Sequence, residues 1–502
     1  MNDIILGVYF ISLLILFAFG SHGFVMIFHY FKHRDAEEPE TLPLKEFPMV
    51  TVQLPIFNEL YVVRSLIEAS CAIKYPADKL EIQVLDDSTD ETVSLVDTIV
   101  GEMKAKGHNI HHVRRNSRKG FKAGALKDGL EIAAGEFIAI FDADFVPREE
   151  FLLKTLPYFY SDKKIGMVQT RWEHLNSEYS LLTRTQAMAL DGHFVIEQSI
   201  RNKAGFFINF NGTGGVWRKT CIEDAGNWHS DTLTEDLDLS YRAQLRGWKF
   251  KFLKNVTSPA ELPSEINALK TQQFRWTKGA IETARKMLPA VWKSDLPFKI
   301  KWHSTFHLTN NLVFPFILIA GILNIPLMFI KHAGGYDAYF NVMSIFVFAF
   351  ISSFLFYMYS QKDVYTDWRR RLFLFPLFMA GSMGFAVNNS RAVIEGLFKR
   401  KSDFVRTPKY SIKKKGDSWL DKKYVPIKFN WTVLIEIALA VYCLFGVICS
   451  LYYLEIAAIP FQLLFLIGFG FVSYLSIQQA LQARRLMKAE HLLHPGAVAA
   501  QA

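Results

Sequence analysis

Short apolar runs alternate with helix-periodic stretches from residue 49 onward, and much longer apolar runs lie on either side of the region 45–300. Five runs rich in β-branched and aromatic residues predict strands at Val50–Leu54, Ile82–Leu85, Ile110–Val113, Phe137–Phe141 and Gly166–Thr170. Apolar positions with helical spacing predict helices at Glu59–Ala72, Glu91–Ala105 and Gly120–Ala134. This alternation predicts a doubly wound, mainly parallel sheet, in which ligands gather at the carboxyl ends of the strands.

The apolar runs outside this region are long enough to cross a membrane. Ile4–Phe31 is almost uncharged, is followed at once by basic residues, and is too long for the apolar core of a cleaved signal peptide. Four further runs predict spans at Leu312–Ile330, Asn341–Tyr359, Thr432–Leu454 and Pro460–Gln478. We therefore expect an integral membrane protein that spans the bilayer several times.

Positive charge decides how a shorter run, Leu372–Val387, is interpreted. The net charge is +9, and the Lys and Arg clusters lie beside apolar runs, which the positive-inside rule explains better than binding to nucleic acid. If Leu372–Val387 spanned, the basic segment Arg391–Lys428 would lie across the membrane from Arg369–Arg371. We expect a re-entrant or interfacial helix instead, and hence five spans, with every basic loop in the cytosol.

Composition agrees with a soluble unit held between membrane segments. Of the 502 residues 50% are apolar, and the 44 Phe and 13 Met gather mainly at the two ends of the chain. The four cysteines form no CxxC pair and no zinc-type spacing, which suits a cytosolic domain. The expected parts are an N-terminal transmembrane helix at 1–34, a cytosolic α/β domain at 45–300, transmembrane and interfacial helices at 301–480 with a cytosolic basic loop at 391–430, and a cytosolic tail at 481–502.

Acidic residues follow two of the predicted strands. In VLDDSTDET, Asp86 and Asp87 come directly after a strand, although Asp90 or Ser88 could simply cap the next helix. In IAIFDADFVP, Asp142 and Asp144 lie two positions apart, so an extended chain would turn both carboxylates the same way. Such a pair suits Mg²⁺ or Mn²⁺, and a cation held there would bridge the diphosphate of a nucleotide-sugar.

Two later motifs add candidate chemistry. In LTEDLDL, Thr234 and Asp236 precede a helix-periodic stretch, which suits an N-cap, a general base, or both. In TQQFRWTKGA, Arg275 could pair with diphosphate oxygens, and the indole of Trp276 could stack on a sugar ring. An isolated Arg-Trp pair would be ordinary packing at a membrane interface. A role in binding substrate is favoured because four such motifs, DDS, DAD, TED and QQFRW, occur in this order.

In this order, DDS, DAD, TED and QQFRW resemble the D, DxD, TED, QxxRW signature of membrane-embedded family 2 glycosyltransferases, the group of cellulose synthases, plant mannan synthases and ceramide glucosyltransferases. The phrases VLDDSTDET, GFKAGALKDGL, AIFDADF, FNGTGGVWR and GWKF look closest to the mannan and glucomannan synthase-like branch. The resemblance covers residues 45–300 strongly and the flanking helices by layout. It implies a GT-A-type, Rossmann-like catalytic domain beside an α-helical transmembrane region.

The resemblance also implies roles for individual residues. Asp236 would be the catalytic base, and Asp144 with Asp142 would bind the metal. The residues implied for the donor are Asp86, Asp87, Lys122, Asp142 and Arg275. Those implied for the acceptor are Trp276, Gln272 and Asn211. FVRTPK at 404–409 resembles the gating loop FxVTxK of cellulose synthases, with Arg406 in place of Val.

Three functions remain open from the sequence. The first is an inverting synthase that moves hexose from UDP-glucose or GDP-mannose to a growing β-linked glycan, with β-1,4 the expected linkage, and exports it through its own helices. The second adds one β-hexose to a lipid such as ceramide or diacylglycerol. QQFRWTKG lacks the Cys-Gly-Pro ending of plant mannan synthases, so the donor could differ from theirs. The third is a transporter with a nucleotide-binding insert, which is disfavoured because Glu436 and Glu455 are nearly the only acids in the apolar runs.

Overall fold

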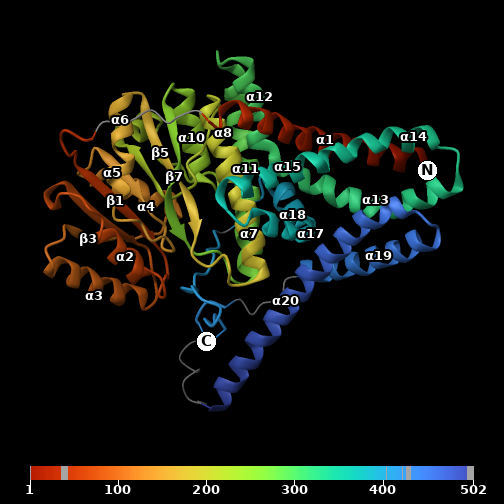
Figure 1. Ribbon diagram of the computed structural model, residues 1–502. Coiled ribbons are helices and arrows are strands. Elements are labelled where there is room, and N and C mark those ends of the chain that lie inside the picture. The colour runs from red at the N-terminus through yellow and green to blue at the C-terminus, as the bar shows by residue number, and fades with distance from the viewer. Residues whose placement is uncertain (1, 36–42, 403, 421, 426–430, 494–502) are drawn as a thin grey trace.

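The computed structural model describes residues 2–35, 43–402, 404–420, 422–425 and 431–493, with side chains up to residue 485. An α/β unit lies at one end, and long helices extend from it to the right of Figure 1. The predicted basic loop at 391–430 and tail at 481–502 fall partly outside the described residues. The description below therefore concerns the α/β unit, the helical arm and the contacts between them.

A seven-stranded mixed sheet forms the centre of the α/β unit, with strand order β3-β2-β1-β4-β6-β5-β7. The strands are β1 (Val50–Ile56), β2 (Leu80–Asp86), β3 (Ile110–Arg114), β4 (Phe137–Ile140), β5 (Ile165–His174), β6 (Gly215–Arg218) and β7 (Lys249–Ala260). The five predicted strands are confirmed. Strand β6 runs antiparallel to both of its neighbours, β4 and β5, whereas the other pairs are parallel.

Helices cover both faces of this sheet, as a doubly wound fold requires. One apolar layer packs α2 (Val63–Cys71) and α3 (Thr92–Ala105) on the strands. The other packs α4 (Phe121–Glu131), α9 (Lys219–Asp224) and α10 (Glu235–Leu245) on the opposite side. The three predicted helices correspond to α2, α3 and α4, which begin or end a few residues inside the predicted limits. The central strands are consequently buried on both faces, and only their carboxyl ends are open to a ligand.

Further helices join the sheet to the arm. They are α5 (Phe151–Thr155), α6 (Pro157–Ser161), α7 (Leu181–Asp191), α8 (Ser199–Lys203) and α11 (Ile266–Lys293), with a π-helical turn, Gly192–Gln198, between α7 and α8. The arm contains α1 (Asn2–His33), α12 (Phe298–Thr309), α13 (Val313–Ala333), α14 (Asp337–Met343), α15 (Val347–Val364), α16 (Trp368–Arg371), α17 (Phe375–Gly384), α18 (Ala386–Leu397), α19 (Thr432–Tyr452) and α20 (Ile459–Leu493).

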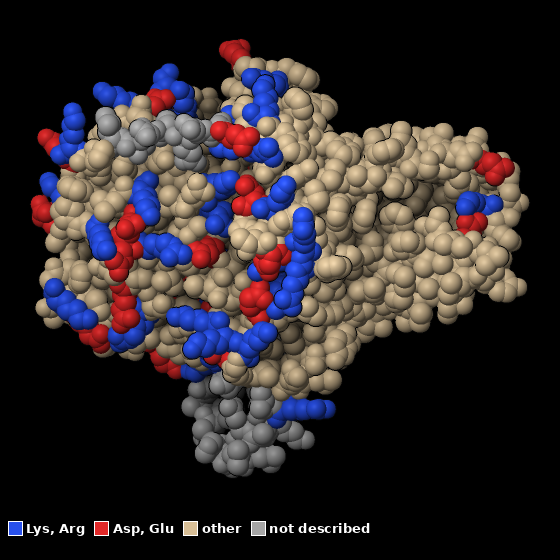
Figure 2. All heavy atoms as spheres, viewed as in Figure 1, with Lys and Arg blue, Asp and Glu red and all other residues tan. Residues whose placement is uncertain are grey.

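Five helical stretches of the described chain are long and apolar enough to cross a membrane: Asn2–His33, Phe298–Ala333, Asp337–Val364, Thr432–Tyr452 and Ile456–Arg485. They coincide with the five predicted spans. Figure 2 shows Lys, Arg, Asp and Glu gathered over the α/β unit, whereas the arm is nearly free of them except at its far tip. The chain thus has the architecture of an integral membrane protein.

The run Leu372–Val387 behaves differently from these spans. Its helices α17 and α18 belong to a pair bent by 45°. Both ends of the pair contact the α/β unit, because Arg371 lies 3.3 Å from Glu178 and Lys278 lies 3.5 Å from Glu395. By length and composition, such a bent pair is either a broken span or a re-entrant loop.

The far tip of the arm brings together the other ends of the spans. Lys331 in the last turn of α13 pairs with Glu455 just after α19, and the Tyr336 hydroxyl donates to Asp3 of α1 at 3.3 Å. Glu436, the other acid in an apolar run, lies 2.7 Å from Lys270 of α11. Both acids are therefore paired with lysine, which agrees with a structural role rather than an ion pathway.

Candidate active site

A cavity opens at the carboxyl ends of β1, β2 and β4 and encloses about 1280 Å³, including the solvent at its mouth. Its lining comes from the loops after these strands, from α4, α10 and α11, and from segment 404–409. Every site residue predicted from the sequence lines it except Asp86; those brought together are Asp87, Lys122, Asp142, Asp144, Asn211, Asp236, Gln272, Arg275 and Trp276. Residues far apart in the sequence therefore meet at the switch between parallel strands, where doubly wound folds bind ligands.

Asp86 requires a correction, because its side chain is fully buried and faces away from the cavity lining. Its carboxylate accepts hydrogen bonds from the Ser88 backbone N–H at 2.8 Å and from His112 Nε2 at 2.9 Å. Burial acts to raise the pKa of Asp86, but the hydrogen bonds from His112 and Ser88 outweigh it, and the pKa lies below its usual value. Asp86 therefore joins β2 to β3, and it is not placed to touch a donor.

Asp87 is the member of this pair that reaches the cavity. Arg115 holds its carboxylate with two hydrogen bonds, at 2.9 and 2.5 Å, so its position is fixed. Asp90 has the capping role that the sequence left open, since it accepts from the Thr92 backbone N–H at 3.0 Å at the start of α3.

Both carboxylates of the DAD motif face the cavity because the backbone turns between them. The sequence predicted instead an extended chain, in which side chains two positions apart point the same way. The Phe145 N–H donates to the Asp142 carbonyl, which closes a turn directly after β4. Asp142 accepts from Lys122 Nζ at 2.5 Å, and Asp144 accepts from Lys409 Nζ at 2.5 Å. Each carboxylate thus has an ammonium beside one of its oxygens.

Both lysines are held in their charged form by these partners. Burial lowers the pKa of Lys122, but Asp142 and Glu235 more than offset it, so the pKa is raised. Lys409 follows the same pattern with Asp144, Glu261 and Glu59 as the neighbouring acids. The cavity lining therefore carries fixed cations and anions in direct pairs, which suits a strongly charged ligand.

Asp236 lies in the first turn of α10 and is half-buried. Its pKa is raised to about 7 by burial and by the negative charge of Glu235, while Lys122 acts to lower it. A carboxyl group with a pKa near neutrality can accept a proton from a hydroxyl and is suited to general-base catalysis. Thr234 stands at the N-cap position, but its hydroxyl bonds Thr283 at 3.1 Å instead of capping the helix.

The loop Asn211–Gly214 packs directly against this base. Gly212 has φ +80°, and a Cβ there would lie 3.1 Å from Asp236 Oδ2 and 3.4 Å from Lys122 Nζ. The Gly212 carbonyl also accepts from Lys122 at 2.9 Å. Only glycine combines this backbone conformation with so close an approach.

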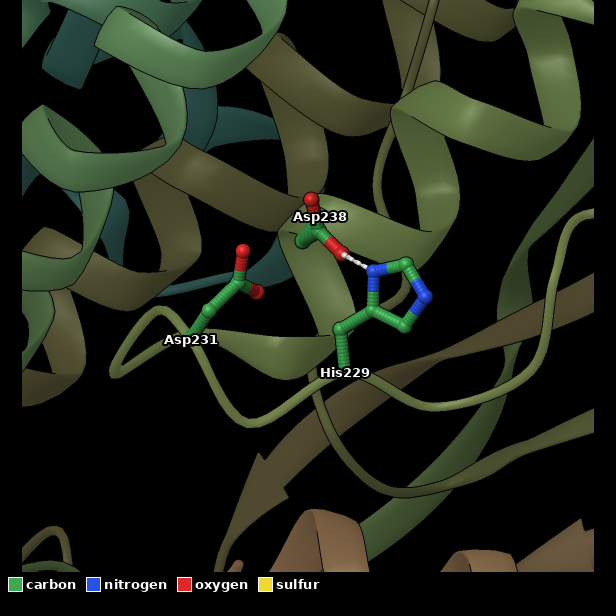
Figure 3. A group of neighbouring side chains, drawn as sticks. All are labelled: His229, Asp231 and Asp238. Atoms are coloured by element: carbon green, nitrogen blue, oxygen red, sulfur yellow. Dashed lines mark ion pairs between the residues drawn. The ribbon is translucent and has the colours of Figure 1, made fainter.

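A group of three side chains beside the base, His229, Asp231 and Asp238, has the geometry of a metal site (Figure 3). Lys286 of α11 lies 2.8 Å from Asp231, 2.9 Å from Asp238 and 3.2 Å from His229 Nδ1. Arg242 adds a second cation at 2.9 Å from Asp238. Because these cations already neutralise the two carboxylates, the group fixes the start of α10 to α11 and does not suit a divalent cation.

One wall of the cavity is aromatic. Trp276 of α11 lies with its ring centroid 6.5 Å from that of Trp172, at the end of β5. The indole N–H of Trp172 is buried and makes no hydrogen bond, and His174 lines the cavity two positions later. The sequence analysis missed both residues, although a tryptophan just after a predicted strand was a usable signal.

Segment 404–409 follows α18 in the chain and reaches into the cavity. Arg406, which stands where cellulose synthases have Val, pairs with Glu59 at 3.1 Å, and both side chains are nearly buried. Burial raises the pKa of Glu59 to about 8, with Arg406 acting in the opposite direction. Phe404 lies between the Phe121 ring, at 5.5 Å, and the Arg275 guanidinium, at 4.8 Å. Glu59, also missed from the sequence, gives this segment an anchor of its own.

The residues after this segment dock on the α/β unit through one carboxylate. Glu261 accepts from three successive backbone N–H groups, those of Tyr410, Ser411 and Ile412, at 3.2, 2.8 and 3.2 Å. In this structure the segment thus covers the cavity and contributes Arg406 and Lys409 to its lining.

Comparison with known proteins agrees with this geometry. Residues 48–279 match the family described as "Glycosyltransferase like family 2". The chain is 37% identical over 449 residues to a probable glucomannan 4-beta-mannosyltransferase 2 of Oryza sativa subsp. japonica, covering 85% of this chain and 75% of that protein. It is 44% identical over 262 residues to glucomannan 4-beta-mannosyltransferase 2 of Arabidopsis thaliana, covering 51% of this chain and 49% of that protein.

A solved structure shares the fold. The mannosyltransferase of Pyrobaculum calidifontis, in complex with GDP-Man and Mn2+, superposes with a TM-score of 0.54 at 18% identity over 78% of this chain and all of that one. The predicted GT-A-type catalytic domain is thus confirmed. With its fold, its motif residues gathered in one cavity and these relatives, the chain belongs to the family 2 glycosyltransferases, in the group of the glucomannan 4-β-mannosyltransferases.

Proposed function

We propose that the protein transfers mannose from GDP-mannose to a growing β-1,4-linked glycan and feeds that glycan through its own helices. The observation that carries this proposal is the cavity, in which a base, fixed cations and an aromatic wall meet beside the apolar arm. The names of the relatives support mannose over glucose. Incubating the purified protein with a panel of GDP- and UDP-sugars and measuring nucleotide release tests the donor; release from UDP-sugars alone would contradict it.

The residues support a single displacement. The acceptor hydroxyl attacks the anomeric carbon, Asp236 takes its proton, and the bond from that carbon to the diphosphate breaks. Lys122 and Arg275 meet the negative charge of the departing diphosphate. Because one step inverts the anomeric centre, an α-linked donor gives a β-linkage.

The DAD carboxylates suit a divalent cation by their chemistry. Asp142 and Asp144 come from one turn in the cavity, and carboxylate oxygens are preferred ligands of Mg²⁺ and Mn²⁺. Lys122 and Lys409 each pair with one oxygen of these carboxylates, Asp142 Oδ1 and Asp144 Oδ2, whereas cations hold both oxygens of Asp238 in the His229 group. When bound, the cation would stabilise the charge of the leaving diphosphate. Mn²⁺ in the Pyrobaculum calidifontis enzyme makes it the first ion to test.

The catalytic domain is proposed to lie in the cytosol, where nucleotide-sugars are available, and this gives a topological prediction. A single cysteine placed at Gly335, at the far tip of the arm, should react with an impermeant label from outside in sealed right-side-out vesicles, whereas one at Lys414 should not. The four natural cysteines are buried and should add little background. Labelling at Lys414 from outside would mean that Leu372–Val387 spans the membrane.

Trp276 is proposed to hold the last sugar of the growing chain on its flat indole face. Trp276→Ala should shorten or abolish the glycan, because stacking is lost, while hydrolysis of the donor by water survives at least in part. Product length by gel filtration and nucleotide release measured on one preparation separate the two effects. Equal loss of hydrolysis would place Trp276 on the donor side.

A further inference from the structure

The π-helical turn Gly192–Gln198, the one such stretch in the described part of the chain, lies directly behind the loop that carries Asn211. π-Helical turns cost backbone hydrogen-bond geometry, and they occur frequently at functional sites. This one places His193, Glu197 and Gln198 in contact with each other or with Asn211. None of the motifs found in the sequence includes these residues.

The turn holds both ends of the Asn211 amide. Gln198 Nε2 donates to Asn211 Oδ1 at 2.6 Å, and Asn211 Nδ2 donates to His193 Nε2 at 2.8 Å. A reversed amide would set two N–H groups against each other at Gln198 and two lone pairs against each other at His193. Both hydrogen bonds would then be lost, so one orientation is strongly preferred.

This preference depends on the tautomer of His193. Glu197 lies 2.9 Å from His193 Nδ1, so that nitrogen carries the proton and Nε2 keeps the lone pair that Asn211 needs. Arg201, which is 1% exposed, stands 3.6 Å from Glu197 and donates to the carbonyls of Phe207 and His303 at 3.0 Å. The buried network therefore extends from the cavity to α12 at the membrane.

The Asn211 side chain still has one N–H and one lone pair of its amide oxygen that can hydrogen-bond a ligand in the cavity that it lines. The next residue, Gly212, accepts a hydrogen bond from Lys122 and leaves no room for a side chain beside Asp236, so a sugar bound to Asn211 would lie beside the base. We propose that His193 is a positioning residue that fixes the Asn211 amide and thereby sets which hydroxyl of the acceptor sugar reaches Asp236. This inference rests on the proposed function and deepens it, since it concerns the acceptor alone.

The test compares the full-length enzyme with His193→Leu, which cannot accept a hydrogen bond, and His193→Gln, whose side-chain oxygen can replace Nε2. With GDP-mannose and β-1,4-manno-oligosaccharides, His193→Leu should lower kcat/KM for the acceptor about 10-fold or more, mainly through KM, because one hydrogen bond is lost and the amide is then held only at its oxygen. Donor hydrolysis by water should stay within about threefold. His193→Gln should restore most of the wild-type kcat/KM for the acceptor.

Gln198→Met removes the other hydrogen bond to the amide. It should likewise lower kcat/KM for the acceptor while donor hydrolysis stays nearly unchanged. The inference can therefore be tested even if His193→Leu folds poorly. His111→Leu changes an exposed histidine on β3 that bonds only Asn109 and serves as the matched control. Equal loss of hydrolysis and transfer, or unchanged transfer in both variants, would overturn the inference. Absence of mannosyl transfer by the wild-type enzyme would contradict the proposed function instead. Acceptor kcat/KM and donor hydrolysis of the variants would then be compared with the donor and acceptor that the wild-type enzyme does use.

Discussion

Asp236→Asn is expected to lower glycosyl transfer by about 10²–10⁴-fold, the usual contribution of a general base, while the donor still binds. An amide cannot take the proton of the acceptor hydroxyl, yet it nearly matches the carboxyl group in shape. The transfer rate checks the loss of catalysis, and calorimetry of nucleotide binding checks that the donor still binds. Comparable loss of donor affinity would make Asp236 a binding or capping residue.

The pH dependence of the wild-type enzyme gives an independent control. A base works only when deprotonated, and the pKa of Asp236 is raised to about 7 by burial and by Glu235. Transfer should therefore increase as pH rises through about 7, and the residual activity of Asp236→Asn should lack this step. A step of equal size in the variant would assign the titration to another group.

Asp144→Asn is expected to remove most metal-dependent activity, about 10²-fold or more, because a ligand that stabilises the departing diphosphate is lost. The substitution should also affect stability, because Asp144 and Lys409 are each only 10% exposed and pair at 2.5 Å. The variant leaves a buried ammonium without its partner, and such a loss typically costs about 3–5 kcal/mol.

The double variant Asp144→Asn/Lys409→Met separates the two effects. Removing the unpaired charge should restore the melting temperature toward that of the wild type, while activity stays low because the ligand is still missing. Activity is measured against Mn²⁺ concentration for the wild type, Asp144→Asn and the double variant, so that the dependence on metal can be compared. Recovery of activity in the double variant would show that Asp144 acts only as the partner of Lys409.

The sequence identified the elements that follow from strong local patterns. The strands β1 to β5 are runs of β-branched and aromatic residues, and the five spans are long apolar helices, so period and length were sufficient. Strand β6, GVWR, begins with a glycine and ends with an arginine, and β7 carries Lys249, Lys251 and Lys254, so neither has a strong strand pattern.

The site was predicted as a set of residues but not as a set of contacts. Whether Asp86 or Asp87 faces the cavity depends on which side of a strand end each one takes, and a partner such as His112 is invisible in a motif. The same holds for Arg406 with Glu59, which are brought together only by the fold. The π-helical turn behind Asn211 has no recognised sequence signal, so the residues that orient that amide could not be found in advance.

The linkage of the product tests the central claim most directly. The wild-type enzyme, incubated in detergent or sealed vesicles with GDP-mannose and a divalent cation, should make a polymer that β-mannan-specific glycosidases digest. The one-bond carbon–hydrogen couplings of its anomeric centres, measured by NMR, should be those of β-linkages. An α-linked product would contradict the single displacement at Asp236, and a discrete lipid carrying one hexose would contradict glycan synthesis.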